Sequence, residues 1–264
     1  MSCGNPCPAP NVRCADSVDE KDALSARYDE ALISARARGT VQETKDFESQ
    51  VPSSTVTTCM PDDVMQRIAK SDSEVYQCFY QQLHSGQRRP VDNEFDNFRE
   101  SHDSKLFPYY KDHMVFGALS LGELGISYYG GFCCHLKEVA VQTRTSVFEE
   151  NVFNFVKNHK LAADDPIPAG FRASWQERGK LAVSKLHSSI EKGMGKKEFI
   201  EVLLPACDTP GEEDFIEAHI YKGFNRGSIE TVTSRKANGK AEKAVQSIIR
   251  KHLVSAGVSL KVVH

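Results

Sequence analysis

Asp214-Phe-Ile-Glu-Ala-His-Ile-Tyr221 is the stretch that decides the fold of this 264-residue chain. Its residues alternate strictly, so a strand here would put its aliphatic side chains, Ile216, Ala218 and Ile220, on one face. The other face would carry a carboxylate, an imidazole and two aromatic rings, from Phe215, Glu217, His219 and Tyr221. This mixture is typical of the wall of a ligand cleft. The pattern therefore predicts a half-buried strand with Glu217 as the candidate site residue, and an amphipathic strand that merely faces water is the alternative.

The composition is that of an ordinary soluble globular protein, with 40% hydrophobic and 26% charged residues. A formal net charge of -3 favours neither a general nucleic-acid binder nor a protein of the membrane surface. No apolar run approaches the ~18–20 residues of a membrane span. Residues 1–6 also lack the basic and apolar regions of a signal peptide. We expect a cytoplasmic protein, or one delivered into a target cell by a route that needs no signal peptide.

Eight cysteines occur in the chain, at positions 3, 7, 14, 59, 78, 133, 134 and 207. A chain of this length needs no disulfides to form a core, and no Cys-x-x-Cys pair is present. Free thiols are therefore the expected state, and no metal site is predicted.

The N-terminal part divides into two segments. Residues 1–17 are rich in Pro, Cys and Asn without periodicity, which predicts a flexible leader. Residues 18–105 form a predicted helical region, with a helix over Asp19–Arg38, a polar linker over Glu43–Thr58 and a helical apolar stripe from Met65 to Leu83.

The predicted fold class is α+β, with residues 106–264 forming a domain around a mixed or antiparallel sheet. The predicted strands besides the opening stretch are His113–Gly117, Phe132–Leu136, a central Glu198–Leu204 and Val258–Val263. The cleanest amphipathic helix has its apolar residues between Ala241 and Leu253.

The order of these C-terminal elements resembles DarT-type ADP-ribosyltransferases. The residues concerned are Phe215-Ile-Glu-Ala-His-Ile-Tyr221, Ser228-Ile-Glu-Thr-Val232, the helix from Lys240, and Val258-Ser-Leu-Lys-Val262. Tyr129-Gly-Gly-Phe-Cys-Cys-His-Leu-Lys137 is also similar to a tyrosine-glycine strand of related toxins. The resemblance covers about half of the chain and implies an ADP-ribosyltransferase fold for residues 106–264.

The resemblance implies a bacterial toxin or effector that uses NAD, with Glu217 as the catalytic carboxylate. Tyr129 and Gly130 would hold the nicotinamide end, and Arg144, with Ser146 beside it, would pair with the pyrophosphate. The histidine-threonine strand of the family has no clear counterpart, and His113 is its nearest stand-in. The acceptor would be a protein or a nucleic acid, and an immunity or antitoxin protein is a further expected partner.

Two other functions fit the residues. A cysteine-dependent hydrolase would use Cys133 or Cys134 as the nucleophile, with His219 or His187 as the base. A non-catalytic binding protein would carry Glu217 and His219 as ordinary surface residues.

Overall fold

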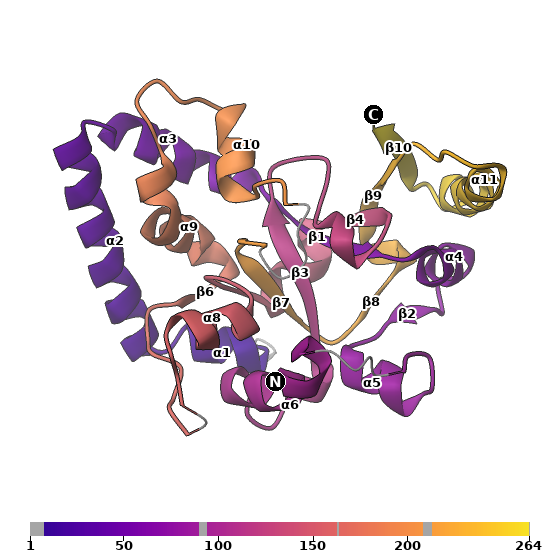
Figure 1. The fold of residues 1–264 in the computed structure, drawn as a ribbon, viewed down its shortest axis with the longest axis horizontal. Helices are drawn as coiled ribbons and strands as arrows, with labels where there is room; N and C mark the ends of the chain where they lie inside the picture. The colour runs from indigo at the N-terminus through magenta and orange to yellow at the C-terminus, as the bar shows by residue number, and fades with distance from the viewer. Residues whose placement is uncertain (1–7, 90–93, 163, 208–212, 264) are drawn as a thin grey trace, which may run out of the picture.

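An eight-stranded sheet lies at the centre of the protein in this computed structural model, which describes residues 8–89, 94–162, 164–207 and 213–263 (Figure 1). Neighbouring strands are antiparallel except β9 and β10, which are parallel. The sheet is thus mixed, and the chain combines helices and strands as predicted. The strands in spatial order are β10 (Ser259–Val263), β9 (Ile229–Arg235), β4 (Phe132–Leu136), β1 (Thr55–Met60), β3 (Met114–Ser120), β7 (Glu217–Tyr221), β5 (Thr145–Phe148) and β6 (Arg172–Ser174).

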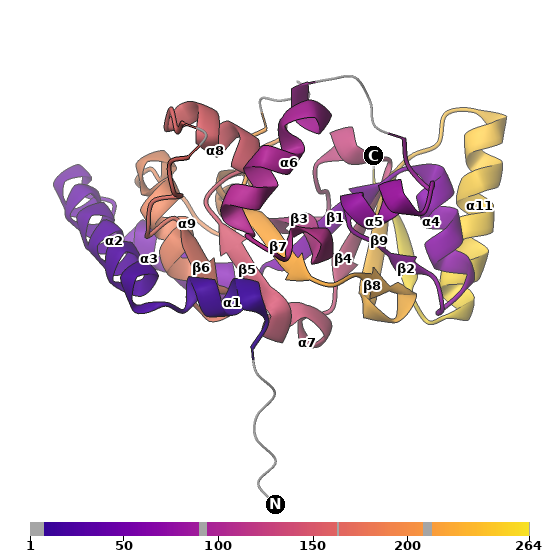
Figure 2. The same cartoon turned by 90° about the horizontal axis from the view of Figure 1, so that it is seen from below.

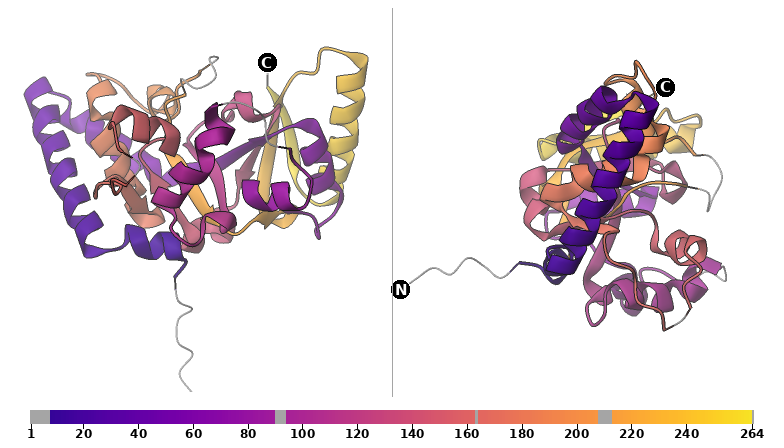
Figure 3. Two further views of the ribbon diagram at one scale, coloured as in Figure 1. Left: turned by 60° about the horizontal axis from the view of Figure 1, so that its bottom comes forward. Right: turned by 90° about the vertical axis from the view of Figure 1, so that its left-hand side faces the viewer.

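Helices cover both faces of the sheet and both of its ends. Figures 2 and 3 show α2 (Val18–Arg38) and α11 (Lys240–Ser255) at opposite ends of the molecule. Within the described residues, no helix is both long and apolar enough to cross a membrane. The remaining elements are α1 (Pro10–Ala15), α3 (Val41–Gln50), α4 (Asp62–Lys70), β2 (Val75–Tyr76), α5 (Phe79–His84), α6 (Glu94–Leu106), α7 (Glu138–Val141), α8 (Val152–Asn158), α9 (Arg178–Leu186), α10 (Glu198–Leu203) and β8 (Phe224–Asn225).

The predicted strand Asp214–Tyr221 contains β7, which begins only at Glu217 and is buried on both faces. Ile216, Ala218 and Ile220 belong to the larger hydrophobic core. The other face lies against a second apolar cluster that includes Leu106 of α6 and Phe155 of α8. The expectation of a half-buried strand is therefore wrong. β7 lies between β3 and β5 in the sheet interior, where packed side chains cover most of both faces.

The predicted leader and domain boundary both need correction. Residues 1–7 lie outside the described residues, but Pro10–Ala15 form a helix, and the Asn11 side chain donates to the Ser146 hydroxyl at 3.0 Å and to the His219 carbonyl at 2.9 Å. β1 comes from the predicted helical region 18–105 and lies between β3 and β4. A boundary after residue 105 would therefore divide one sheet.

Two segments differ from the predicted secondary structure. The predicted linker Glu43–Thr58 holds most of α3 and most of β1, because Thr44 and Phe47 bury one helical face and Val56 enters the core. The predicted central strand Glu198–Leu204 is α10, whose Phe199 and Leu203 point inward one helical turn apart. Periodicity cannot separate a short buried helix from a strand in so short an apolar run.

Cys59 and Cys133 form a disulfide, which corrects the expectation of free thiols. The two residues lie opposite each other in the β1–β4 ladder, with a Cα–Cα distance of 4.0 Å. Adjacent strands bring these thiols together although 74 positions separate them in the sequence. Among the described residues, Cys14, Cys78 and Cys134 are free.

The disulfide predicts the number of thiols that react in the oxidised protein. Because Cys59 and Cys133 are bonded, at most six of the eight cysteines alkylate in denaturant without reductant. Mass spectrometry should find a peptide linked through Cys59 and Cys133. Reduction should expose all eight thiols and lower the unfolding temperature, since a disulfide of this kind contributes roughly 2–4 kcal/mol. Eight alkylated thiols before reduction would contradict the pairing.

Candidate functional site

The sheet opens between β1 and β3. The two strands pair only from Thr55–Ser120 to Thr57–Ala118 within their described lengths. Beyond that point β1 stays paired with β4 up to Met60, and β3 stays paired with β7 back to Met114. The Thr58 hydroxyl donates to the Phe116 carbonyl at 3.3 Å, where the backbone ladder has stopped. The two halves of the sheet therefore diverge and leave room between them.

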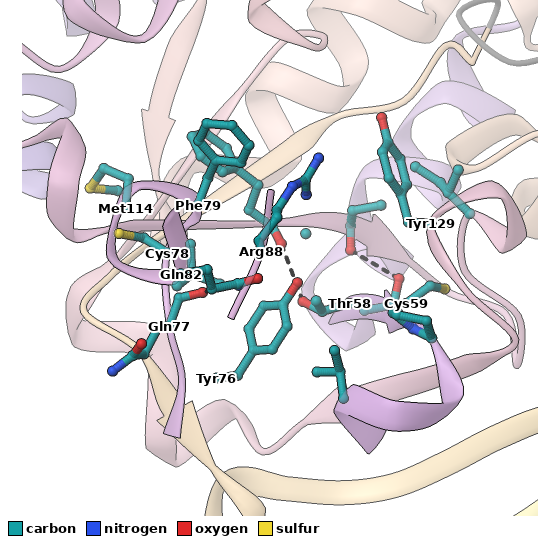
Figure 4. Close-up of a pocket in the computed structure, with 18 of the residues that line it drawn as sticks. Thr58, Cys59, Tyr76, Gln77, Cys78, Phe79, Gln82, Arg88, Met114 and Tyr129 are labelled. Atoms are coloured by element: carbon teal, nitrogen blue, oxygen red, sulfur yellow. Dashed lines mark hydrogen bonds between the residues drawn. The ribbon is translucent and has the colours of Figure 1, made fainter. Parts of the chain in front are cut away.

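A cavity of about 370 Å³ occupies this opening. β1 and β3 supply one part of its wall, and the segment from β2 to α5 supplies another. Figure 4 shows Tyr76 and Phe79 from this segment and Arg88 from the chain after α5, with Thr58 of β1 and Tyr129 across the cavity. Aromatic rings, two guanidinium groups (Arg88 and Arg99) and the Glu217 carboxylate share the lining. Such a wall suits a ligand with planar rings and an anionic group.

Both carboxylate oxygens of Glu217 have a partner. The Nδ2 group of Asn151 donates to Oε1 at 3.2 Å, and Nε2 of His219 lies 2.9 Å from Oε2. Asn151 also starts α8, because its side-chain oxygen accepts from the Phe153 amide at 2.9 Å. Although the Glu217 residue is only 4% exposed, it lines the cavity. The structure thus holds a carboxylate in a fixed orientation at the edge of the opening.

Arg99 of α6 extends beside this carboxylate. Its guanidinium carbon lies 4.6 Å from the centre of the Phe79 ring and 5.0 Å from that of Phe116, and its Nε donates to Asp103 at 3.3 Å. Desolvation works against the charge of Arg99, but the carboxylates of Asp103 and Glu217 outweigh it and raise the pKa of the guanidinium. Arg99 is therefore a fixed cation in a largely aromatic wall.

A second cavity of about 110 Å³ adjoins the first. The two cavities have five lining residues in common, namely Arg99, Phe116, Tyr129, Asn151 and Glu217. α6 and α8 supply much of the second lining, including His102, Asp103 and Phe153. The Glu217 carboxylate consequently faces two neighbouring spaces, one on each side of the same wall.

Tyr129, predicted to hold the nicotinamide end, lies in the same wall as Glu217. It belongs to the loop after β3 and lines both cavities. Desolvation, followed by the carboxylates of Glu217 and Glu213, raises the pKa of its phenol. The ring is therefore a neutral aromatic surface that a planar group can stack against.

Arg144 and Ser146, both predicted to bind the cofactor, lie outside these two cavities. The Arg144 guanidinium donates to the carbonyls of Tyr221 and Lys222 at 2.7 Å and of Gly223 at 3.2 Å, where the chain leaves β7. Burial lowers the pKa of this guanidinium. The Ser146 hydroxyl accepts from Asn11. Arg144 thus binds the backbone that follows β7, and Ser146 binds Asn11 of α1.

His113 and Gly130 also differ from their predicted roles. His113 is exposed, and its Nδ1 lies 3.4 Å from the Gln81 amide nitrogen, outside both cavities. Gly130 has φ +152, and a Cβ there would lie 2.0 Å from the Met60 carbonyl carbon. Packing of the loop against β1 therefore requires this glycine, and it serves the site by placing Tyr129.

Three important residues of the wall were not predicted. In the sequence, Asn151 before an apolar run indicates only the start of a helix. That pattern does not predict its contact with Glu217. Arg99 is paired with Asp103 one turn later in α6, as many surface residues are. Thr58 fell in the stretch interpreted as a linker. Each reaches the site through tertiary packing, which one sequence does not reveal.

Neither Cys133 nor Cys134 is suited to be the nucleophile of a cysteine-dependent hydrolase. Cys133 is bonded to Cys59. Cys134 is fully buried with its sulfur 3.6 Å from that of Met65, and burial raises the pKa of its thiol to about 12. Of the two proposed bases, His219 contacts Glu217 and His187 lies beyond α9. A neutral, buried thiol is a poor nucleophile.

The role assigned to Gly130 predicts a contrast with its neighbour. Gly130→Ala should lower the free energy of unfolding by at least ~1–3 kcal/mol, because the loop must shift away from β1. Gly131→Ala is the matched control, since its Cβ would meet only an Asp62 oxygen at 3.9 Å. Denaturant unfolding of both variants measures the difference. Equal stabilities would show that the loop does not pack against β1 in this way.

Comparison with known proteins adds no assignment. The chain matches no protein-family model, and no curated protein matches its sequence. The similarity to DarT-type enzymes therefore remains a resemblance of residue pattern in the C-terminal half.

Proposed function

We propose that this protein is an ADP-ribosyltransferase that breaks the nicotinamide–ribose bond of NAD and transfers ADP-ribose to a macromolecule. The observation that supports it most is the Glu217 carboxylate, fixed at both oxygens in the wall of the opening between β1 and β3. A carboxylate held in this way can stabilise a cationic transition state.

The lining of the cavities fits the parts of NAD. The rings of Tyr129, Tyr76 and Phe79 offer faces for nicotinamide and adenine. Arg99 and Arg88 take the place that the sequence gave to Arg144, because their guanidinium groups can pair with pyrophosphate oxygens. Cavities of ~300–1,000 Å³ are usual for ligands of this class.

Glu217 has two tasks in this reaction. When the bond between the nicotinamide nitrogen and the ribose carbon breaks, the electron pair of that bond leaves with nicotinamide. The Glu217 carboxylate stabilises the positive charge that develops on the ribose carbon. The acceptor then forms a bond to that carbon, and Glu217 takes the proton that the acceptor loses. The second cavity provides a direction from which an acceptor can approach.

The biological setting is part of the same proposal. A transferase of this kind acts as a toxin or effector, on a protein or a nucleic acid, and a bacterial cell that makes it needs an immunity or antitoxin protein. Glu217 and its neighbours leave the choice of acceptor open.

Release of nicotinamide from labelled NAD tests the proposal. Glu217→Gln should lower the rate by about 10²–10³-fold, the usual cost of losing an electrostatic stabiliser, while NAD binding is largely retained. Glu230→Gln, on the exposed surface of β9, is the matched control and should behave as wild type. A wild-type protein that binds NAD without releasing nicotinamide, with cell lysate present as acceptor, would indicate a binding protein instead.

Arg99 and Arg144 give opposite predictions. Arg99→Gln should weaken NAD binding by about tenfold to a hundredfold, the value of one charge-assisted hydrogen bond. Arg144→Gln should leave the Kd unchanged but destabilise the fold, because three backbone carbonyls lose a donor. Calorimetric titration and thermal unfolding of both variants measure this. If Arg144→Gln weakened NAD binding and Arg99→Gln left the Kd unchanged, Arg144 would be the residue that binds the pyrophosphate.

A further inference from the structure

His219 lies two residues after Glu217 on β7, so both side chains project from the same face of the sheet. Its Nε2 is 2.9 Å from Oε2 of Glu217. A carboxylate oxygen is an acceptor, so Nε2 must carry the hydrogen in this pair. The imidazole therefore donates to the oxygen that Asn151 does not hold.

Aromatic rings surround the imidazole. The Phe107 ring lies edge-on at 4.7 Å between centroids, Phe116 at 5.5 Å and Phe148 at 5.9 Å. His219 is 2% exposed, and among the described residues it is not part of the lining of either cavity. The rings cover the imidazole and restrict its plane, and within the described part of the chain its polar side-chain contact is with the Glu217 carboxylate.

We infer that His219 is a positioning residue that fixes the orientation of the Glu217 carboxylate toward the cavity, and this inference rests on the proposed function. Without the imidazole, Oε2 would lose its donor and the carboxylate could rotate about its last side-chain bond, since Asn151 alone would remain. The sequence motif is then Glu-x-His on one strand, in which the histidine acts through the glutamate and does not touch NAD.

The role is distinguishable from simple packing by two substitutions. His219→Leu keeps an apolar side chain of similar bulk but removes the donor, and His219→Gln keeps an N–H donor near the position of Nε2. For His219→Leu, kcat for nicotinamide release should fall by about 10²-fold, the effect of misplacing a catalytic group, with an unchanged Kd for NAD. His219→Gln should recover most of that rate.

His135 provides the matched control. It is a second buried histidine on the same face of the sheet, in β4, where its Nε2 lies 2.9 Å from the Glu123 carbonyl oxygen and away from Glu217. His135→Leu should destabilise the fold without lowering kcat of the folded protein. The inference is overturned if His219→Leu retains the wild-type kcat, or if His219→Gln is as slow as His219→Leu.

NMR of the histidine side chains separates this inference from the proposed function. Long-range ¹⁵N–¹H spectra of the wild type should show His219 with its hydrogen on Nε2, and Glu217→Ala should shift the His219 signals but not those of His135. If wild type releases no nicotinamide but these shifts appear, the proposed function fails and the pairing of His219 with Glu217 stands. A hydrogen on Nδ1 alone, or signals unaffected by Glu217→Ala, would overturn the inference whatever the activity.

Discussion

The carboxylate of Glu217 within the sheet is the constraint on which the site depends. Removing a carboxylate from water costs several kcal/mol unless donors and cations replace the lost solvation. Asn151 and His219 supply the donors, and Arg99 supplies a nearby positive charge. These groups come from α8, β7 and α6, so the helices over this face must pack correctly before the carboxylate is satisfied. Fold and site are therefore coupled through one side chain.

The opening between β1 and β3 is the second requirement, because a buried carboxylate without a space beside it could not act on a ligand. The disulfide joins β1 to β4 on one side of the opening, and the long ladder of β3 with β7 strengthens the other. The loop after β3 then packs against β1 at Gly130 and presents Tyr129 to the cavity. Paired strands thus bound the space on two sides, and the segment from β2 to α5 and the loop after β3 complete its wall.

Sequence reasoning succeeded where a pattern is local. The alternation of Asp214–Tyr221 identified β7, and helical periodicity identified α2 and α11. The sequence did not predict features that depend on tertiary packing. Short segments such as α10 and β1 take their form from the core they enter, and a Gly-rich loop can reflect close packing as well as ligand binding. Arg144 shows the same limit, since an arginine that binds phosphate and one that binds backbone carbonyls look alike in a sequence.

The most direct test of the central claim is a crystal structure of the Glu217→Gln variant with NAD. We expect the nicotinamide ribose beside residue 217 in the opening between β1 and β3, with the pyrophosphate near Arg99 and an aromatic ring of the wall against nicotinamide. NAD bound elsewhere on the protein, or a cavity that stays empty at saturating NAD, would contradict it.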